Sequence, residues 1–198
     1  MRRREPIRAA LADGGRFLRG LLRDPRRTGA LAPSSAGLAR AMAEAGAGQK
    51  GLIVELGPGT GPVTTALLDS GVAPERLVLV EFDPEFCRLL QGRFPAVRVV
   101  RGDAFALATT LAEFRGQKIG AVVSSLPLLN EPPPARAGLL EEAFALMGDS
   151  GVYVQFTYGL KAPIPRALAQ GAYVVRRRAT VWRNLPPAHV WTYRRQGA

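Results

Sequence analysis

From residue 52 onward, short apolar runs alternate with segments in which apolar residues recur at helical spacing. The apolar runs suit strands that are buried on both faces, and they predict strands at 52–56, 77–81, 97–101, 119–124 and 151–158. The segments between them predict helices near 62–70, 84–93, 105–114 and 135–147. This alternation is typical of a parallel sheet with helices on both faces.

Both ends of the chain depart from this alternation. Residues 172–182 and 189–195 are β-rich runs joined by a Pro-containing turn, which predicts an antiparallel hairpin at the end of the sheet. Residues 1–48 contain two helical patterns and no strand pattern. We therefore predict an α/β fold with a seven-stranded, mostly parallel sheet in residues 49–198, preceded by an N-terminal helical extension in residues 1–48.

The first of the two helical patterns, between Ile7 and Leu22, is amphipathic and basic. At about 100° per residue its apolar side chains fall on one side of the helix and its arginines on the other. Such a helix can lie in a membrane interface, with its arginines at anionic headgroups, or it can dock on its own domain. The residues that we assign to membrane contact are Arg8, Arg16, Phe17, Leu18, Arg19, Leu21 and Leu22.

The composition narrows the class of protein. With 198 residues and 47% hydrophobic content, the chain is long enough for one globular domain with a substantial core. Its single cysteine excludes an internal disulfide and fits a reducing compartment, and no apolar run approaches the roughly 20 residues that cross a bilayer. We therefore expect a cytoplasmic protein, soluble or peripheral to a membrane, without a secretory signal.

The net charge of +11 is concentrated at the two ends of the chain. Residues 1–27 hold nine Arg and three acidic residues, and residues 171–198 hold six Arg and no acid, whereas the middle is nearly neutral. Phospholipid headgroups and nucleic acid are both polyanions that such ends can bind. A solvated surface on an Arg-rich protein would give the same pattern.

Three glycines directly follow the first predicted strand, at positions 57, 59 and 61. Glycine leaves space for a ligand against the backbone, and a helix from Pro62 would point its N-terminus at that ligand. A phosphate-binding Walker loop needs Lys and Ser or Thr after its last glycine, whereas Pro62 and Val63 stand there. The acid Glu81, at the end of the next strand, leaves a dinucleotide-binding fold possible.

Four motifs in order resemble those of class I S-adenosylmethionine-dependent methyltransferases. They are ELGPGTG at 55–61, VLVEFDP at 78–84, RGDAF at 101–105 and VVSSLPL at 122–128. The resemblance implies a Rossmann-like class I methyltransferase fold for residues 49–198, with S-adenosyl-L-methionine as cofactor, S-adenosyl-L-homocysteine as product and no metal. It also implies that the cofactor is bound by Glu55, Gly57, Gly59, Gly61, Glu81, Phe82, Asp103, Ala104 and Ser124.

Over nearly its full length the chain is similar to bacterial phospholipid N-methyltransferases. The similarity rests on the basic amphipathic N-terminal segment, ELGPGTG, SSLPLLN (124–130), FTYG (156–159) and NLPPAHVW (184–191). It implies stepwise N-methylation of phosphatidylethanolamine towards phosphatidylcholine, by a peripheral enzyme at the inner face of the cytoplasmic membrane.

Two alternatives to this activity stay open. The chain is also similar to rRNA adenine dimethyltransferases, although those carry an Asn at the SLPL position and a further helical domain. Methylation of adenine in rRNA or another nucleic acid is therefore the alternative activity. A protein that binds the cofactor without catalysis is a third possibility. It is disfavoured because every cofactor motif is intact.

The methyl acceptor would be held beyond the carboxyl ends of the strands. A guanidinium binds phosphate through two hydrogen bonds, and a Tyr side chain can donate to phosphate or face a cationic amine. We expect Tyr158, Ser124 and His189 to take part in catalysis. The phosphate of the substrate would be bound by Arg40, Tyr158, Arg177, Arg178 and Arg195. The expected partners are anionic lipids and phosphatidylethanolamine rather than nucleic acid, and we expect a monomer.

Overall fold

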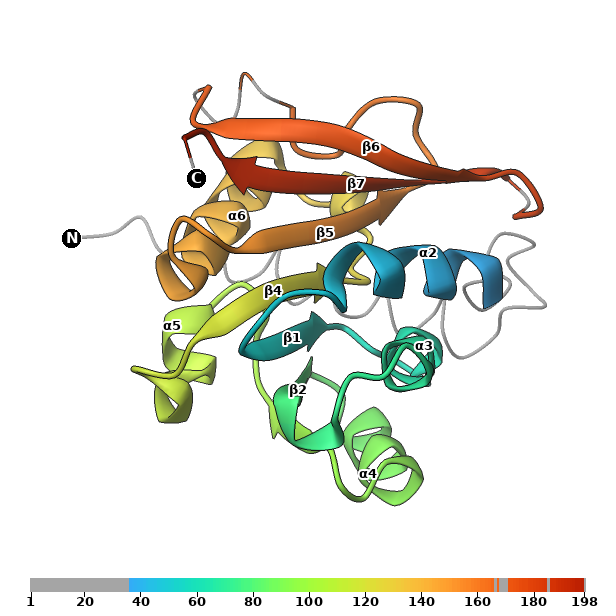
Figure 1. The fold of residues 1–198 in the computed structure, drawn as a ribbon, viewed down its shortest axis with the longest axis vertical. Coiled ribbons are helices and arrows are strands. Elements are labelled where there is room, and N and C mark those ends of the chain that lie inside the picture. Colours follow the sequence, from blue (N-terminus) through green and yellow to red (C-terminus); the bar gives the residue numbers. More distant parts are fainter. Residues whose placement is uncertain (1–35, 166, 168–170, 185, 198) are drawn as a thin grey trace, which may run out of the picture. The chain divides into compact units, whose positions relative to one another are not determined.

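The computed structural model describes residues 36–165, 167, 171–184 and 186–197. The predicted amphipathic helix, with all of the residues assigned to membrane contact, lies outside these ranges. The first described element is helix α2 (Ala36–Gly46), and Figure 1 shows it against the sheet that follows.

Seven strands of the described chain form one sheet in the order β3-β2-β1-β4-β5-β7-β6. The parallel strands are β1 (Leu52–Leu56), β2 (Leu77–Glu81), β3 (Arg98–Arg101), β4 (Ile119–Ser124) and β5 (Val152–Thr157). β7 (Ala188–Arg195) runs antiparallel to β5 and pairs with β6 (Tyr173–Val181). The predicted mostly parallel sheet with a C-terminal antiparallel hairpin is therefore confirmed.

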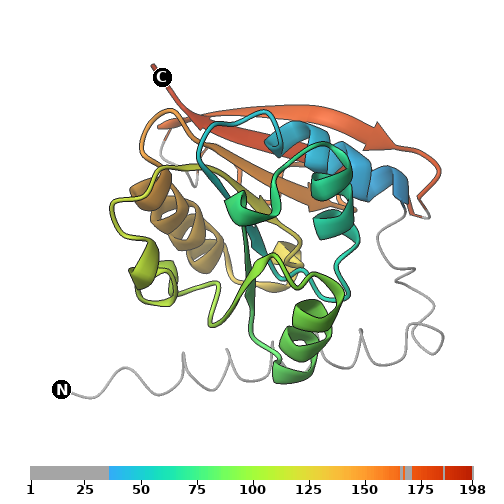
Figure 2. The same cartoon turned by 60° about the horizontal axis from the view of Figure 1, so that its bottom comes forward.

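Helices cover both faces of this sheet (Figures 1 and 2). On one face α2, α3 and α4 pack in an apolar cluster that includes Ile53 of β1, and on the other α5 and α6 pack in a cluster that includes Val54. Neighbouring residues of a strand point to opposite faces, so each strand contributes to both clusters. The remaining helical elements are α3 (Pro62–Asp69), η1 (Pro74–Arg76), α4 (Pro84–Arg93), α5 (Leu107–Thr110), η2 (Ala112–Phe114), η3 (Leu128–Asn130) and α6 (Pro133–Met147).

Helix α2 is part of this packed structure, although it precedes the domain boundary predicted between residues 48 and 49. Leu38 and Met42 lie on one side of the helix and are fully buried in the cluster with Ile53. The packed body of the described residues therefore begins before that predicted boundary.

The predicted strands agree with the observed ones within one residue at each end. The helix predicted at 105–114 is wrong in its middle, because α5 and η2 are separated at Leu111. Thr109 and Thr110 are β-branched and favour a helix weakly. The Thr110 hydroxyl also donates to the Asp103 carbonyl, 2.9 Å away, and so ties this turn to the preceding loop.

Candidate functional site

The strand order reverses between β1 and β4. From β1 the sheet continues to β2 and β3 on one side, whereas β4 lies on its other side. The carboxyl ends of two such strands are the place where open α/β sheets bind ligands. Two segments meet there: the glycine loop (residues 57–61) after β1 and the β4 loop (residues 125–127), whose Ser125 N–H donates to the Leu56 carbonyl at 2.9 Å.

The glycine loop has a left-handed backbone at three positions. The angle φ is 64° at Gly57, 58° at Gly59 and 85° at Gly61, a region that favours glycine. A Cβ on Gly57 would lie 2.7 Å from a side-chain carbon of Leu126, and one on Gly61 would lie 2.6 Å from the Phe94 ring. A Cβ on Gly59 would meet no described atom within 4 Å, so the middle of the loop leaves space for a ligand.

Glu55 lies in β1 directly before this loop and is fully buried. The hydroxyl of Thr64 donates to its Oε2 at 2.7 Å, while Oε1 is buried with no hydrogen-bond partner among the described residues. Burial raises the pKa of the Glu55 carboxyl to about 8, against the opposing effect of the Thr64 hydrogen bond. Oε1 is thus an unused acceptor beside the glycine loop.

Glu81 ends β2 and is bound to three backbone N–H groups. Its Oε1 accepts from Phe82 at 2.8 Å and from Asp83 at 2.9 Å, and its Oε2 accepts from Gly59 at 3.2 Å. Burial raises the pKa of this carboxyl, and the backbone N–H groups partly oppose the shift. The structure therefore brings Glu81 to the glycine loop, as the sequence predicted.

The other predicted cofactor residues follow β2 and β3 at the same edge. Phe82 is 60% exposed. The Gly102 N–H donates to the Glu81 carbonyl at 3.0 Å, which places the loop with Asp103 and Ala104 beside the end of β2. Asp103 accepts from its own loop, through Oδ1 and the Phe105 N–H at 2.8 Å, and Ala104 is buried.

The β4 loop is held by buried polar side chains. Gln155, fully buried in β5, donates from Nε2 to the carbonyls of Leu126 at 2.8 Å and Phe156 at 2.9 Å. Ser124 is also fully buried, and its hydroxyl oxygen accepts from the Leu126 N–H at 3.4 Å. The Ser125 hydroxyl is buried without a partner among the described residues. The Ser124 hydroxyl therefore holds the backbone of the β4 loop, and the Ser125 hydroxyl has no hydrogen-bond partner among the described residues.

Tyr158 and His189, both predicted to take part in catalysis, lie on different faces of the sheet. Tyr158 follows β5, meets the Phe156 ring edge to face at 5.5 Å, and packs on the face that α2 covers. His189 lies between two β7 residues of that face and therefore points to the other one. It is 3% exposed, and its Nδ1 lies 3.0 Å from the Thr180 hydroxyl. The structure does not bring the two side chains together.

Two of the predicted phosphate-binding arginines lie in β6. Arg177 places its guanidinium 6.0 Å from the centre of the Trp191 ring. Arg178 is exposed at a register shift, where it has no partner residue in β7. Both are available to an anion, and Arg177 has an aromatic partner in addition.

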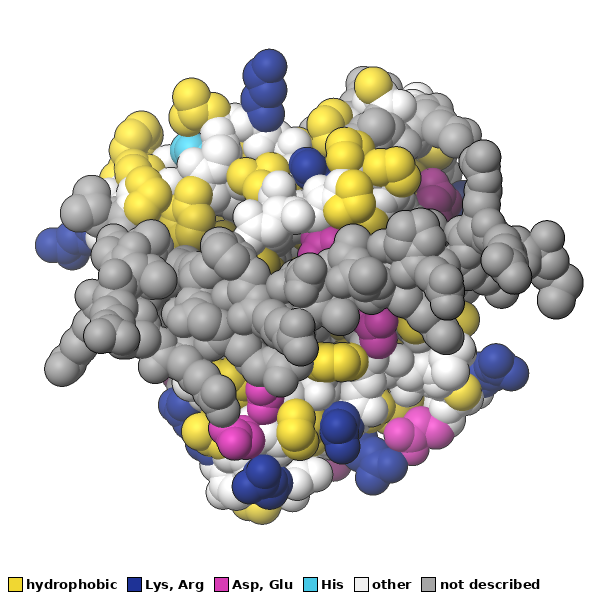
Figure 3. All heavy atoms as spheres, turned by 180° about the vertical axis from the view of Figure 1, so that it is seen from behind, with side chains coloured by type: hydrophobic (Ala, Val, Ile, Leu, Met, Phe, Trp, Pro, Cys, Tyr) yellow, Lys and Arg dark blue, Asp and Glu magenta, His cyan; other side chains and the backbone are white. Residues whose placement is uncertain are grey.

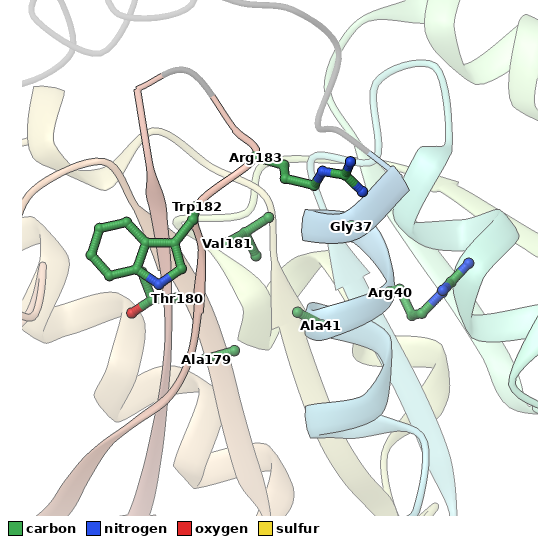
Figure 4. Close-up of a pocket in the computed structure, with 8 residues that line it drawn as sticks. All are labelled: Gly37, Arg40, Ala41, Ala179, Thr180, Val181, Trp182 and Arg183. Atoms are coloured by element: carbon green, nitrogen blue, oxygen red, sulfur yellow. The ribbon is translucent and has the colours of Figure 1, made fainter.

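Arg40 belongs to a shallow cavity of about 580 Å³ between α2 and the end of β6. In Figure 4, Arg183 extends from the β6 end toward Gly37 in the first turn of α2. Among the described residues that line the cavity, these two arginines carry the charge, and most of the others are small or apolar. Its lining consists of Gly37, Arg40, Ala41, Ala179, Thr180, Val181, Trp182 and Arg183.

Arg195 is not at this edge. β7 is antiparallel to β5, so its last residues lie at the amino ends of the parallel strands, opposite to Tyr158. There Arg195 pairs with Asp149 at 3.3 Å and lies 5.7 Å from the centre of the Tyr173 ring. The expectation that Arg195 binds the same phosphate as Tyr158 does not fit this position.

Sequence reasoning missed three residues that shape the site. Thr64 donates a hydrogen bond to Glu55, and Gln155 donates one to the β4 loop. Arg93 donates from Nη1 to the Thr60 carbonyl of the glycine loop at 2.6 Å. Gln155 could have been found, because it is a polar residue within a buried apolar strand. Thr64 and Arg93 give no such signal, since both residue types are common on helices.

The described residues contain neither a group of metal-ligating side chains nor a helix that could span a membrane. None of their His, Cys, Asp and Glu side chains form a group of three that could hold a metal ion. No helix in the described part of the chain has the length and apolarity needed to cross a membrane.

Comparison with known sequences gives partial matches. No protein-family model matches the chain. An ornithine lipid N-methyltransferase of Singulisphaera acidiphila is 34% identical over 109 residues, which are 54% of this chain and 57% of the relative. A ribosomal RNA small subunit methyltransferase A of Synechococcus sp. is 47% identical over 58 residues, 28% of this chain and 20% of the relative. The chain thus spans little more than half of the first relative and a fifth of the second.

Solved structures match over more of the chain. Burkholderia thailandensis 1,6-didemethyltoxoflavin-N1-methyltransferase, solved with S-adenosylhomocysteine, has a TM-score of 0.69 and 18% identity over 99% of this chain and 92% of its own. The glycopeptide N-methyltransferase MtfA, complexed with S-adenosyl-L-homocysteine, has a TM-score of 0.61 and 16% identity over 84% and 92%. The fold is therefore the Rossmann-like fold of class I S-adenosylmethionine-dependent methyltransferases.

Proposed function

We propose that this chain uses S-adenosyl-L-methionine to methylate the amine of a lipid headgroup, with phosphatidylethanolamine as the acceptor. The observation that carries the cofactor assignment is the pair of buried carboxylates, Glu55 and Glu81, on either side of an open glycine loop where the strand order reverses. The lipid assignment is supported by the partial match to an ornithine lipid N-methyltransferase. It is also supported by the sequence similarity to phospholipid N-methyltransferases.

The residues at this edge fit the cofactor in charge and in hydrogen bonding. The carboxylate of Glu81 can accept from both ribose hydroxyls, and the exposed Phe82 ring can stack on adenine. Asp103 and Ala104 would hold the edge of the base. The Oε1 atom of Glu55, which has no partner among the described residues, can accept a hydrogen bond from the amino group of the cofactor's methionine part. The open space at Gly59 leaves room for the cofactor between its methionine part and its ribose.

The bound cofactor would supply an activated methyl group on a sulfonium. The acceptor nitrogen would displace the sulfur from this methyl group in line, so the task of the residues at this edge would be to align the acceptor and to exclude water. An alkyl ammonium has a pKa of roughly 10 and must lose a proton before attack. No described side chain stands out as the base, since His189 is buried and bonded to Thr180.

The acceptor side of the site is formed by segments after β4 and β5. Gln155 and Ser124 fix the β4 loop, and Tyr158 follows β5 at the same edge. We propose that Tyr158 contacts the headgroup. Arg40 of α2, which lines the adjoining cavity, is the cation that we propose for the lipid phosphate, with Arg178 of β6 as a second cation. Arg177 lies over Trp191 on the face of the sheet opposite to Tyr158, so it does not fit the same phosphate.

The proposed enzyme is a monomer that binds peripherally to the inner face of the cytoplasmic membrane. The amphipathic pattern between Ile7 and Leu22 and the basic ends of the chain support contact with anionic lipids.

Glu81→Gln tests the cofactor assignment. We expect roughly 10- to 100-fold weaker binding of S-adenosylhomocysteine by calorimetry, because hydrogen bonds to a charged group contribute about 1.5–3 kcal/mol. Glu75→Gln is the matched control, because Glu75 is exposed in η1, directly before the amino end of β2 and away from the glycine loop. Unfolding temperatures of both variants separate lost affinity from lost stability. Unchanged affinity in Glu81→Gln would remove Glu81 from the cofactor site.

The acceptor is tested by transfer of labelled methyl from S-adenosylmethionine. Parallel tubes contain vesicles of phosphatidylethanolamine with an anionic lipid, vesicles of ornithine lipid with the same anionic lipid, and unmodified rRNA. We expect label in phosphatidylethanolamine. Label in ornithine lipid alone would keep the lipid class and reject this acceptor, and label in rRNA alone would reject the lipid class.

Methylation of rRNA adenine is the second candidate because of one specific observation. The 58 residues that match the ribosomal RNA methyltransferase are 47% identical, a higher local identity than that to the lipid enzyme. The β6–β7 hairpin, with six Arg and no acid in residues 171–198, would suit a phosphate backbone as well as a lipid surface.

A further inference from the structure

Most of the large hydrophobic side chains that are strongly exposed in the described residues lie at one edge of the sheet. Leu129 follows β4 and is 50% exposed, Leu160 follows β5 and is 78% exposed, and Trp182 follows β6 and is 77% exposed. β6 runs in the same direction as β5, because each is antiparallel to β7. All three side chains therefore lie beyond the carboxyl ends of strands, at the edge that carries the glycine loop.

These three residues, which we call the apolar crest, follow strands β4, β5 and β6 of one sheet, and the segments that carry Leu129 and Leu160 are in contact. A Cβ on Gly159 would lie 3.3 Å from a methyl carbon of Leu129, so η3, which carries Leu129, is in contact with the segment that carries Leu160. Trp182 comes one residue after Val181, the last residue of β6 to pair with β7. Figure 3 shows hydrophobic side chains gathered beside the single histidine, His189, which marks this end of β7.

Charge separates the apolar crest from the other exposed side chains at this edge. Lys161 directly follows Leu160 and Arg183 directly follows Trp182, and both cations are exposed. Phe82, in contrast, is followed by the acid Asp83, which suits the cofactor end of the edge rather than an anionic partner. Glu131, two residues after Leu129, is the acid nearest the crest in sequence; burial and the neighbouring Asp103 raise the pKa of its carboxyl, against the opposing effect of Arg136.

We propose that the apolar crest, with Lys161 and Arg183, is a contact surface for a lipid bilayer that contains anionic lipids. An amphipathic indole, aliphatic side chains and adjacent cations are the groups that favour the headgroup region of a bilayer. Because the crest adjoins the β4 loop and Tyr158, this contact presents the headgroups to the acceptor side of the site. The proposal rests on the proposed lipid substrate and adds the surface by which the enzyme meets it.

Quenching of tryptophan emission by lipids with brominated acyl chains tests this contact in the full chain. The chain has two tryptophans, and Trp191→Phe leaves Trp182 as the only emitter. With vesicles of phosphatidylethanolamine and phosphatidylglycerol, we expect emission to shift to the blue and to fall on bromination. Protein that sediments with vesicles while Trp182 stays unquenched would overturn the proposal.

A second measurement does not depend on the tryptophan spectrum. We expect Leu160→Ser/Trp182→Ser to weaken partition onto the same vesicles roughly tenfold or more. Leu89→Ser is the matched control, because Leu89 is 44% exposed on α4, away from the crest. Equal partition of the two variants would also overturn the proposal.

Activity distinguishes failure of this proposal from failure of the proposed function. Leu160→Ser alone leaves the cavity lined by Arg40 and Trp182 unaltered. It should reduce methyl transfer to vesicles and keep transfer to short-chain phosphatidylethanolamine dispersed in detergent. If the unaltered chain methylates neither form of the lipid, the proposed function fails, whereas equal transfer to vesicles by Leu160→Ser and the Leu89→Ser control contradicts the crest.

Discussion

Glu55 is an acidic side chain in the middle of a buried strand, where an ionised carboxyl costs free energy unless it is fully hydrogen-bonded. The Thr64 hydroxyl satisfies one oxygen and leaves the other without a described partner. The folded protein therefore favours the neutral form, and the pKa rises to about 8. An incoming cationic amino group would reverse this preference, because it favours the ionised form.

We expect this carboxyl to make stability depend on pH. The unfolded chain releases the proton near its ordinary pKa of 4.5, whereas the folded chain holds it to about 8, so the folded state binds more protons between these values. Stability then falls as pH rises through this range, by up to about 1.4 kcal/mol per pH unit. Urea unfolding of the unaltered chain and of Glu55→Gln at several pH values measures the difference.

The Gln variant supplies the contrast, because its amide does not titrate. Its stability should fall less steeply with pH than that of the unaltered chain over the same range. Parallel curves for the two proteins would mean that Glu55 is ionised in the folded state throughout.

At the level of elements, the glycine loop and the β4 loop interlock. Leu126 of the β4 loop packs against the Cα of Gly57, and the carbonyl of Leu126 is fixed by Gln155. The β4 loop is therefore held on one side by β5 and on the other by the glycine loop. A change in either loop must be accommodated by the other, because the space between them is filled.

Gly57→Ala should disturb both loops. The added methyl meets Leu126 at 2.7 Å, and an L-residue with φ of 64° costs about 1–2 kcal/mol before that contact is counted. Overpacking adds about 1–3 kcal/mol. We expect a lower unfolding temperature and weaker binding of S-adenosylhomocysteine.

Gly71→Ala is the matched control for this comparison. Gly71 has φ of 85°, and its Cβ would meet no described atom within 4 Å, so it carries the backbone cost alone. If both variants lose the same stability, the contact between Gly57 and Leu126 is not a constraint on the site.

The elements could be predicted from the sequence because each one carries a local signal. Apolar runs gave the strands, and the three glycines gave the loop, whose backbone angles fit the residue type. The break at Leu111 gave no such signal; beside it the Thr110 hydroxyl donates to the Asp103 carbonyl, a contact between residues seven apart that no apolar pattern shows. Weak helix formers allow such a break without requiring it.

The site could be predicted where a residue ends a parallel strand, because all these ends share one edge. Glu81 and Ser124 were placed in this way. The arginines of β6 could not be placed, because position along an antiparallel pair depends on register, which alternation alone does not give. Arg195 lies at the opposite edge from the one expected because its strand, β7, runs antiparallel to β5. Gln155 could be singled out as a polar residue in a buried apolar strand, but its contact with the β4 loop could not be predicted, because that loop is distant in sequence.

At the scale of the whole molecule, the net charge of +11 is unevenly distributed along the chain. In residues 171–198, arginines occupy a strand that ends the sheet, whereas acidic residues gather in the nearly neutral middle that holds the proposed cofactor site. The proposed cofactor site thus lies in the nearly neutral part of the chain, whereas positive charge that could attract a lipid phosphate lies in the hairpin.

The outermost described strands of the sheet, β3 and β6, both carry arginine. β3 reads RVVR, with Arg98 and Arg101 exposed, and β6 has three exposed arginines in its middle. An outermost strand has unpaired backbone groups that can hydrogen-bond to a strand of another molecule, and cations along it oppose such pairing. Whatever these arginines contribute to ligand binding, their charges also oppose edge-to-edge pairing between two copies of the sheet.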